Sequence, residues 1–338
     1  MKNLYENFAA IDIGTNSLHL IVVKLNNSGG FEIIDREKEV IRLGEGSSGD
    51  IKQIIPEAME RAVSTLKKFK GIADSYNAKI RAVSTSAVRE AHNRNDFIEL
   101  VYKETGIEVE VISGLEEARI IYLGVMKAVP IYSKKTLIID IGGGSTEFLL
   151  GCKDNVDYSV SMKLGAVRMT QKFFPDFQIT DQRIKDCRKW VEGELYTLAD
   201  NIKERGFEVC VGSSGTIMSV GLMIYAKRKN NSLPSILNNF EFTKDEFDEV
   251  FATILSKKTF EKRKKISGLD EKRADIIPAG IIILKTIFDL FELKRMTISG
   301  YALREGIVID TLQKLSADLD KPNLAQIRKE SVHQLAEK

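Results

Sequence analysis

The sequence predicts an α/β protein of two domains, and a repeated design carries the prediction. Residues Thr136 to Leu150 read TLIIDIGGGSTEFLL: an apolar run, an acid, three glycines, two hydroxyls, a second acid and a second apolar run. The same design occurs at Phe8 to Leu25, FAAIDIGTNSLHLIVVKL. Each stretch is typical of two buried strands joined by a glycine turn. A chain of 338 residues is long enough for two domains, each opened by one such hairpin.

Both glycine turns have the chemistry of a phosphate site. A backbone without Cβ atoms can approach an anion closely, and hydroxyl or amide side chains add donors. The candidate phosphate-binding residues are Thr15, Asn16 and Ser17 in the first turn and Gly142, Gly143, Gly144, Ser145 and Thr146 in the second. Either stretch alone could also be a plain hairpin turn.

The acids beside these turns point to a divalent cation. Asp140 and Glu147 flank the second turn, and Asp12 precedes the first. Their carboxylates are hard oxygen ligands of the kind that Mg²⁺ prefers. We therefore expect Mg²⁺ or another divalent cation as the cofactor.

Composition excludes several other classes. The chain is 43% hydrophobic and 29% charged, as in ordinary globular proteins. Its 50 basic and 48 acidic residues leave a net charge of +2, so no global cationic field indicates a nucleic-acid partner. The three cysteines lack CxxC spacing, which argues against a disulfide framework and a zinc site. The N-terminus lacks an apolar signal core, and the longest apolar run, Ile276 to Leu284, is too short to span a membrane. We expect a cytoplasmic protein without a membrane partner.

The rest of the hydrophobic pattern alternates between strand and helix. A helix rich in apolar residues, 273–290, is either begun or interrupted by Pro278. Trp190 is expected in the core, on the inner face of a helix over 181–202. Further strands are predicted over 31–42, 80–83, 156–161 and 296–299, and further helices over 54–76 and 303–315.

Arg89 is a candidate phosphate ligand in the segment STSAVREA. It lies about one turn beyond a start rich in Ser and Thr, whose hydroxyls can cap a helix. A guanidinium there could bind a phosphate through two nitrogens. A surface ion pair with Glu90 or Asp96 is the alternative.

Two adjacent acids, Glu116 and Glu117, open an apolar helix after the strand-like run VEVISG. The helix dipole favours negative charge in a first turn, which explains both of them without any further function. A carboxylate at a strand-to-helix corner that faces a phosphate is also placed to take a proton from water.

A third stretch, VCVGSSGTIMSV, again combines a strand, glycines and hydroxyls. It adds five candidate phosphate-binding residues, Gly212, Ser213, Ser214, Gly215 and Thr216.

Six motifs, in this order, resemble the exopolyphosphatase and guanosine pentaphosphate phosphohydrolase (Ppx/GppA) family. They are DIGTNS (12–17), STSAVREA (84–91), ISGLEEAR (112–119), DIGGGST (140–146), GSSGT (212–216) and SGYALREG (299–306). The paired hairpins are similar to those of the acetate kinase, sugar kinase, heat-shock chaperone and actin superfamily. The resemblance implies two ribonuclease H-like (actin-like ATPase) domains, each a mixed sheet flanked by helices, with the active-site cleft between them. The expected bounds are 1–128 plus 303–320 for the first domain, 129–302 for the second, and 321–338 for a polar tail.

The family also implies roles for particular residues. Glu117, the second Glu of GLEEAR, is expected to be the catalytic base, and Arg89 is expected to bind phosphate. Asp140 and Glu147 are expected at the divalent cation. The GSSGT loop is expected near the sugar or base of a nucleotide or near a distal part of a polyphosphate.

The implied reaction is hydrolysis of a terminal phosphoanhydride with Mg²⁺. It would release orthophosphate from inorganic polyphosphate, or convert guanosine pentaphosphate (pppGpp) to ppGpp. Both substrates end in the same bond, so both stay open. The family also suggests a homodimer. Two alternatives are a sensor that binds the alarmone or polyphosphate without hydrolysing it and an ATP-dependent kinase of the same superfamily, for which no acceptor motif is evident.

Overall fold

The structure is a computed structural model that describes residues 7–26, 30–46, 52–153, 155–230, 233–234 and 237–317. The chain divides into two compact units. Unit 1 comprises the described residues of Met1–Glu45, Gln53–Pro130 and Tyr301–Lys338, and unit 2 comprises those of Gly46–Lys52 and Ile131–Gly300. Each unit is described by itself. The polar tail expected over 321–338 lies outside the described residues.

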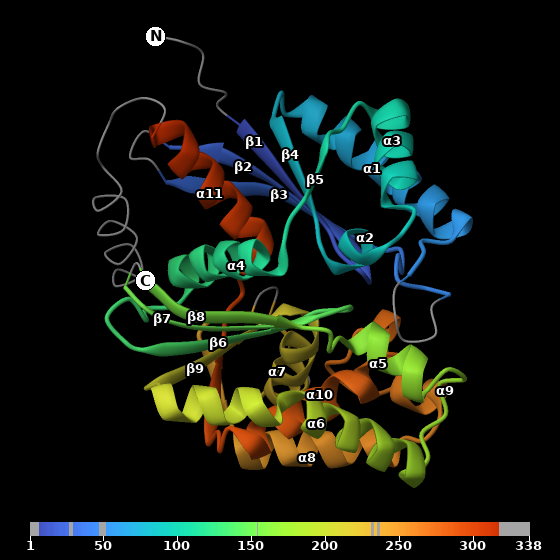
Figure 1. The fold of residues 1–338 in the computed structure, drawn as a ribbon, viewed down its shortest axis with the longest axis vertical. Helices are drawn as coiled ribbons and strands as arrows, with labels where there is room; N and C mark the ends of the chain where they lie inside the picture. The colour runs from blue at the N-terminus through green and yellow to red at the C-terminus, as the bar shows by residue number, and fades with distance from the viewer. Residues whose placement is uncertain are drawn as a thin grey trace. The chain divides into compact units, whose positions relative to one another are not determined.

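Five strands in the described part of unit 1 form a mixed sheet in the order β3-β2-β1-β4-β5 (Figure 1). β1 pairs with β2 in antiparallel fashion and with β4 in parallel fashion. The elements are β1 (Asn7–Ile13), β2 (Ser17–Leu25), β3 (Phe31–Val40), α1 (Pro56–Ser75), β4 (Lys79–Ser84), α2 (Ser86–Glu90), α3 (Arg94–Thr105), β5 (Val109–Val111), α4 (Gly114–Ala128) and α11 (Leu303–Ala317).

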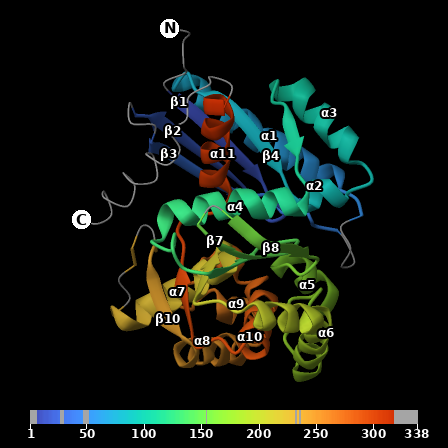
Figure 2. The same cartoon turned by 60° about the vertical axis from the view of Figure 1, so that its left-hand side comes forward.

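Helices cover this sheet because their apolar residues lie on one face. In α1, Ala62, Leu66, Phe69 and Ala73 recur at helical spacing and are fully buried. Helices α1 and α3 pack together, and α4 packs on α11, which also contacts β1 and β2. Figure 2 shows α11 and α4 next to each other beside the strands.

The backbones of α4 and α11 touch where two glycines meet. A Cβ at Gly306 would overlap the carbonyl of Ile120, and a Cβ at Gly124 would overlap the carbonyl of Ala302. No larger residue fits at either position without separating the helices. This contact fixes α4 against α11.

Six strands in the described part of unit 2 form a second mixed sheet, in the order β10-β11-β9-β6-β7-β8. β6 is antiparallel to β7 and parallel to β9. The elements are β6 (Thr136–Ile141), β7 (Thr146–Cys152), β8 (Asn155–Met162), α5 (Ala166–Phe173), α6 (Asp181–Arg205), β9 (Val209–Ser213), α7 (Ser214–Arg228), β10 (Phe240–Thr243), α8 (Lys244–Ser256), α9 (Phe260–Arg263), a 3₁₀ turn (Glu271–Arg273), α10 (Ile277–Leu290) and β11 (Arg295–Ile298).

The core of unit 2 is organised around α10, which is apolar on nearly all sides and packs against α5, α6, α7 and α8. Pro278 lies in the first turn of α10, where its missing N–H is tolerated, so it begins the helix and does not interrupt it. Among the described helices, none, α10 included, is long and apolar enough to cross a membrane.

The expectation of two mixed sheets flanked by helices is confirmed. The expectation that Trp190 is a core residue is wrong, because its side chain is 43% exposed. The buried stripe of α6 runs through Cys187, Val191 and Leu195. Trp190 lies at the edge of that stripe, where the ammonium of Lys172 sits 3.1 Å from its ring centroid. The interdomain cleft stays a prediction.

We expect Gly306→Ala to destabilise the protein, because its methyl group would meet backbone and not a flexible side chain. The free energy of unfolding should fall by about 1–3 kcal/mol, as is usual for overpacking. Chemical denaturation followed by circular dichroism measures it. Gly71→Ala in α1 is the matched control, since nothing lies within 4 Å of the new methyl group. The control should gain up to about 1 kcal/mol from helix propensity. Equal effects of the two substitutions would contradict the proposed role of Gly306.

Candidate functional site

In the first glycine turn, between β1 and β2, the carbonyl groups accept hydrogen bonds from backbone N–H groups. The N–H of Gly14 donates to the carbonyl of Ser17 over 3.1 Å. The carbonyls of Thr15 and Asn16 accept bonds of 2.9 to 3.1 Å from N–H groups of residues 41–44. Within the described ranges, the N–H groups of Thr15 and Asn16 meet no acceptor. Consecutive amides of a turn can bind an anion in this way.

The side chains of this turn are buried and only partly satisfied. The hydroxyl of Thr15 is 2.8 Å from that of Ser86 at the start of α2. Asn16 is 6% exposed, yet neither its Oδ1 nor its Nδ2 has a partner among the described residues. A buried amide without partners costs about 1–3 kcal/mol, so the fold keeps Asn16 at a cost. A bound polar group would satisfy it.

Arg89 and Glu117 form a pair at one end of this unit. Arg89 Nη1 donates to Glu117 Oε2 over 2.9 Å and to the carbonyl of Ile112 over 3.0 Å. Arg89 therefore pairs with Glu117 and not with Glu90 or Asp96. Glu117 is 6% exposed. In the described hydrogen bonds of the Arg89 side chain, the donor is always Nη1. Its Nε and Nη2 therefore remain available as donors.

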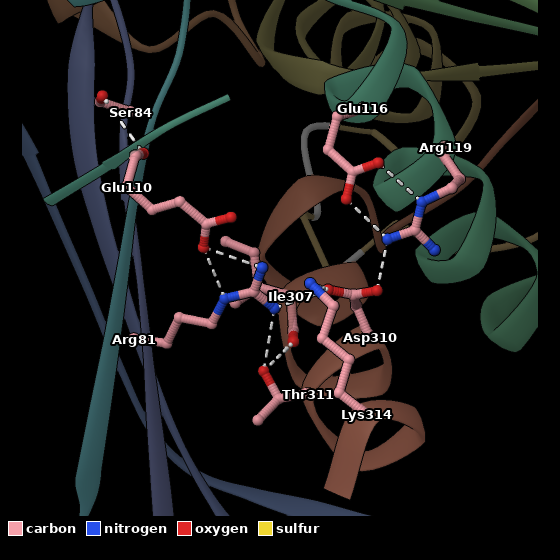
Figure 3. A network of polar contacts seen from close by, with 9 residues as sticks. All are labelled: Arg81, Ser84, Glu110, Glu116, Arg119, Ile307, Asp310, Thr311 and Lys314. Carbon is pink, nitrogen blue, oxygen red and sulfur yellow. Dashed lines mark hydrogen bonds and ion pairs between the residues drawn. The ribbon is translucent and has the colours of Figure 1, made fainter. Parts of the chain in front are cut away.

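The two adjacent acids of GLEEAR point in different directions. Glu116 forms a two-point ion pair with Arg119 at 2.7 and 2.8 Å (Figure 3). Glu117 instead accepts a hydrogen bond of 2.9 Å from Arg89. Successive residues on a helix lie about 100° apart, so one can face the site while the next faces a different neighbour. Hydrogen bonds from Arg119 hold the pKa of Glu116 below its ordinary value. Glu117 is thereby distinguished as the candidate base.

A polar cluster around one buried carboxylate joins α4, α11 and β4 next to Glu116 (Figure 3). Its centre is Asp310, whose side chain is 2% exposed and which contacts Arg119, Arg81 at 2.7 Å and Lys314 at 2.9 Å. Burial alone would raise the pKa of Asp310, but hydrogen bonds from Arg119, Lys314 and Arg81 outweigh burial and lower it to about 2. The cluster holds the first turn of α4, from which Glu117 projects. Asp310 is not among the predicted site residues; its signal in the sequence is an acid in the apolar run IVID of a predicted helix.

The second glycine turn, between β6 and β7, repeats the arrangement of the first. Gly142 N–H donates to the carbonyl of Ser145 over 3.0 Å. The carbonyls of Gly142 and Gly143 accept bonds of 2.9 to 3.1 Å from the first N–H groups of α5, and the carbonyl of Gly144 accepts one of 2.7 Å from Arg168 Nε. For Gly143, Gly144 and Ser145, no acceptor of the N–H group occurs in the described part of the chain. Both turns therefore present amide N–H groups that the described part of the chain does not use.

Gly165 and Arg168 lie behind this turn. A Cβ at Gly165 would overlap the carbonyl group of Gly143, so only glycine lets α5 approach so closely. Arg168 is 2% exposed and is not a surface residue. Both residues orient the turn from behind.

Asp140 and Glu147 lie directly opposite each other on β6 and β7, so their side chains share one face of the sheet. Both are buried. Asp140 Oδ2 accepts a bond of 2.6 Å from the hydroxyl of Ser213, and Glu147 Oε1 accepts one of 2.8 Å from Ser161. Within the described residues, no group of three or more His, Cys, Asp or Glu could hold a metal. Two carboxylates nevertheless fit Mg²⁺, which commonly takes one or two carboxylates together with waters and substrate phosphates. Asp12 belongs to unit 1, where it lies opposite His19 on β2.

The remaining predicted phosphate ligands have structural partners of their own. The hydroxyl of Thr146 donates to the carbonyl of Leu164, so its proton is already used. A Cβ at Gly212 would meet Met296 and Ile217, which gives this glycine a packing role in the core.

The helix start at GSSGT is strained and partly unsatisfied. Ser214 has φ +71°, in the left-handed region that favours glycine. Gly215 lies against the guanidinium of Arg273, where a Cβ would not fit. Thr216 is fully buried, and its hydroxyl has no partner among the described residues. The phosphate-binding role of this loop stays a prediction.

The chain matches known proteins over both units. A family model described as the Ppx/GppA phosphatase family matches residues 21–315. The crystal structure of an exopolyphosphatase from Cytophaga hutchinsonii has a TM-score of 0.85 and 29% identity, and the match covers 91% of this chain and 98% of that one. A Ppx/GppA family member from Aquifex aeolicus has a TM-score of 0.74 and 28% identity, and the match covers 91% of this chain and 98% of that one.

We expect Gly165→Ala to disturb the second turn, because the methyl group would displace the carbonyl of Gly143. The free energy of unfolding should fall by about 1–3 kcal/mol. Binding of inorganic tripolyphosphate, measured by isothermal titration calorimetry, should weaken at least about tenfold, as the loss of one charge-assisted hydrogen bond would produce. Gly193→Ala in α6, with open space around the new methyl group, should bind as the parent does. Unchanged binding by Gly165→Ala would contradict this role.

The low pKa of Asp310 predicts a pH dependence of stability. A carboxyl whose pKa falls on folding stabilises the protein fully above its unfolded value near 4, and this contribution disappears as the pH falls toward about 2. The contribution is about 2 kcal/mol at neutral pH. Urea unfolding of the parent and of Asp310→Asn should therefore differ most above pH 4, and the difference should shrink toward pH 2. A difference independent of pH would exclude this origin.

Proposed function

Because this chain belongs to the Ppx/GppA phosphatase family, we propose that it is a phosphoanhydride hydrolase that releases orthophosphate from the end of a polyphosphate chain. The family resemblance recognised in the sequence is confirmed by the match over residues 21–315. The observation that carries the proposal is the ion pair of Arg89 with the buried Glu117 at the start of α4, in which Arg89 Nη1 lies 2.9 Å from Glu117 Oε2. A structural relative at 29% identity is described as an exopolyphosphatase, which makes inorganic polyphosphate the first substrate to test.

In unit 1, the proposal gives Glu117 the role of general base. Its carboxylate would orient the attacking water and accept its proton, which is worth about 10²- to 10⁴-fold in rate. Arg89 would bind oxygens of the phosphoryl group through the nitrogens that the fold leaves unused. The amides of Thr15 and Asn16 and the unsatisfied side chain of Asn16 would donate to phosphate oxygens.

In unit 2, the second turn would hold phosphate through the N–H groups of Gly143, Gly144 and Ser145. These donors are fixed by bonds on the carbonyl side of the turn, so they need no reorganisation when charge develops. Phosphoryl transfer depends mainly on such positioning and charge stabilisation.

Asp140 and Glu147 would hold Mg²⁺, and Asp12 stays a proposed third ligand. The cation would neutralise phosphate charge when it is bound. The hydroxyls of Ser213 and Ser161 hold the two carboxylates in place from the side. Guanosine pentaphosphate is the second proposed substrate, since it ends in the same phosphoanhydride. A cytoplasmic location and a homodimer are further proposals from the family resemblance.

We expect Glu117→Gln to lower the rate of orthophosphate release by about 10²- to 10⁴-fold while phosphate binding persists. The amide keeps the shape and the hydrogen bond from Arg89 but cannot accept a proton from water. Glu116→Gln is the matched control: it removes one charge from the same helical turn, and the new amide can still accept from Arg119, so the rate should fall far less than tenfold. Orthophosphate release with Mg²⁺ should be assayed from tripolyphosphate, long-chain polyphosphate and guanosine pentaphosphate.

The same assay separates the rival functions. A parent protein that binds these compounds without releasing orthophosphate would be a sensor. Turnover that needs ATP and an acceptor alcohol would indicate a kinase. Equal rates for parent and Glu117→Gln would remove Glu117 from the mechanism.

A further inference from the structure

A strongly basic segment of unit 2 lies between α8 and α10 and has no part in the proposed catalysis. Residues 257–265 read KKTFEKRKK, with six basic residues and one acid, whereas the whole chain has a net charge of only +2. The short helix α9 lies within this segment. Like charges this close together repel one another, so the fold has to hold the segment against its own charge.

The buried side chain of Arg263 holds this segment in place. Arg263 is fully buried, and its guanidinium donates to the carbonyls of Lys257 at 3.0 Å and Lys258 at 3.2 Å. It also donates to the carbonyls of Ala274 at 2.7 Å and Phe177 at 3.0 Å. Burial lowers the pKa of Arg263 to about 10, so the side chain stays charged at neutral pH. The fold therefore orders the backbone of the segment with a buried charge, which is costly.

The lysines of the segment differ in their partners. Lys258 pairs with Asp181 at 2.8 Å, and Lys264 lies 3.7 Å from Glu261. Three further lysines are exposed and form no ion pair among the residues that the structure describes: Lys257, Lys262 and Lys265. Their charges are left unneutralised by this part of the protein.

Other exposed lysines of unit 2 face carboxylates. Lys203 pairs with Glu292 at 2.6 Å, and Lys227 pairs with Glu249. A run of surface lysines often serves only to keep a protein soluble. Here the unneutralised charges are concentrated on a backbone that a buried arginine orders, and this arrangement fits a binding site for a polyanion.

The segment is connected to the second glycine turn through α5. The first N–H groups of α5 donate to carbonyls of that turn. Residues 174–179 follow the other end of α5, and there the N–H of Ile179 donates to the carbonyl of Lys258 over 3.3 Å. Figure 1 shows α9 beyond α5 at the right-hand edge of unit 2. Because α5 has eight residues, it is about 12 Å long. A triphosphate held in the turn is shorter than this helix, whereas a long polyphosphate can extend past it.

We propose that residues 257–265 form a second anion-binding site, at which Lys257, Lys262 and Lys265 bind internal phosphates of a polyphosphate chain whose end is held at the second turn. The inference rests on the proposed function for the identity of the polyanion. Each lysine that neutralises a phosphate releases a counterion, so binding weakens as the salt concentration rises. The site gives the protein a higher affinity for chains that are long enough to reach it.

Single-stranded nucleic acid is the rival ligand. Phe177 is 38% exposed beside the segment, and its ring lies 6.3 Å from that of Phe260. Aromatic side chains next to basic ones bind unpaired bases by stacking. The low net charge of the chain argues against general binding of nucleic acid. Inorganic polyphosphate carries a charge at every repeat and needs only the lysines.

The first test compares long and short phosphate chains by isothermal titration calorimetry, in a Glu117→Gln background that does not consume the polymer. The triple variant Lys257→Gln/Lys262→Gln/Lys265→Gln removes three charges. It should bind polyphosphate of several tens of phosphate groups about tenfold or more weakly, and tripolyphosphate within about twofold of the background. For the long chain, the slope of log K against log salt concentration should fall in magnitude by about 0.7 for each lysine removed. An unchanged affinity and slope would overturn the proposal.

The matched control removes three exposed lysines that lie outside the segment: Lys189, Lys229 and Lys294. Their replacement by Gln changes the net charge equally and should leave the affinity for the long chain within about threefold of the background. An equal loss in the control would show that only the total charge matters, and it would overturn the site. Thermal unfolding shows whether both triple variants are folded. The three single variants of the segment, each with its own change of slope, replace the triple variant if it does not fold.

The second test identifies the polyanion. Single-stranded DNA with the same number of phosphates should bind at least about tenfold more weakly than polyphosphate. DNA that binds as tightly as polyphosphate, and loses that binding in Phe177→Ala, would overturn the identification of polyphosphate.

Turnover separates this inference from the proposed function. With Glu117 intact and Mg²⁺ present, the triple variant should raise KM for long-chain polyphosphate and leave kcat close to that of the parent. A parent protein that binds long-chain polyphosphate but releases no orthophosphate would defeat the proposed hydrolysis, and the binding tests would still decide the role of the segment. A protein that binds the long chain no more tightly than tripolyphosphate would overturn this inference alone.

Discussion

The candidate site depends on the hydrogen bonds that other segments donate to the carbonyl groups of the two glycine turns. Residues 41–44 take the carbonyls of the first turn, and the start of α5 together with Arg168 takes those of the second. These hydrogen bonds hold each turn in a conformation whose amide N–H groups meet no acceptor among the described residues. Because such donors are already fixed, they need not reorganise when an anion binds. Phosphoryl transfer depends on preorganised donors of this kind. Gly165 is needed for the second turn, since its lack of a Cβ lets α5 come close enough to donate hydrogen bonds to the carbonyls of the turn.

The start of α4 shows how packing assigns roles to equivalent side chains. Glu116 and Glu117 are chemically identical neighbours, yet Glu116 pairs with Arg119 beside the Asp310 cluster (Figure 3). Glu117 pairs with Arg89. The glycine contact between α4 and α11 fixes the rotation of α4 that makes this division. The position of the candidate base therefore depends on residues that do not touch a substrate.

Two of the predicted site residues are held in locally unfavourable states. Asn16 is buried without hydrogen-bond partners in the described part of the chain, and Ser214 occupies a left-handed backbone conformation. Such departures from local preference concentrate at functional sites, where the rest of the fold offsets them.

The sequence by itself determined both hairpins, several of the longer helices, and the acids and glycines at the ends of the hairpin strands. These features follow from periodicity and from the backbone freedom of glycine, which act over a few residues. Only the tertiary structure decided that Glu117 and not Glu116 meets Arg89, that Trp190 is exposed, and that Gly165 lies behind a turn. Those outcomes depend on contacts such as that of Arg119 with Asp310, 191 residues apart. Local sequence patterns do not reveal such contacts. The rotation of a helix and the distance to its neighbours depend on the residues, distant in sequence, that pack against it.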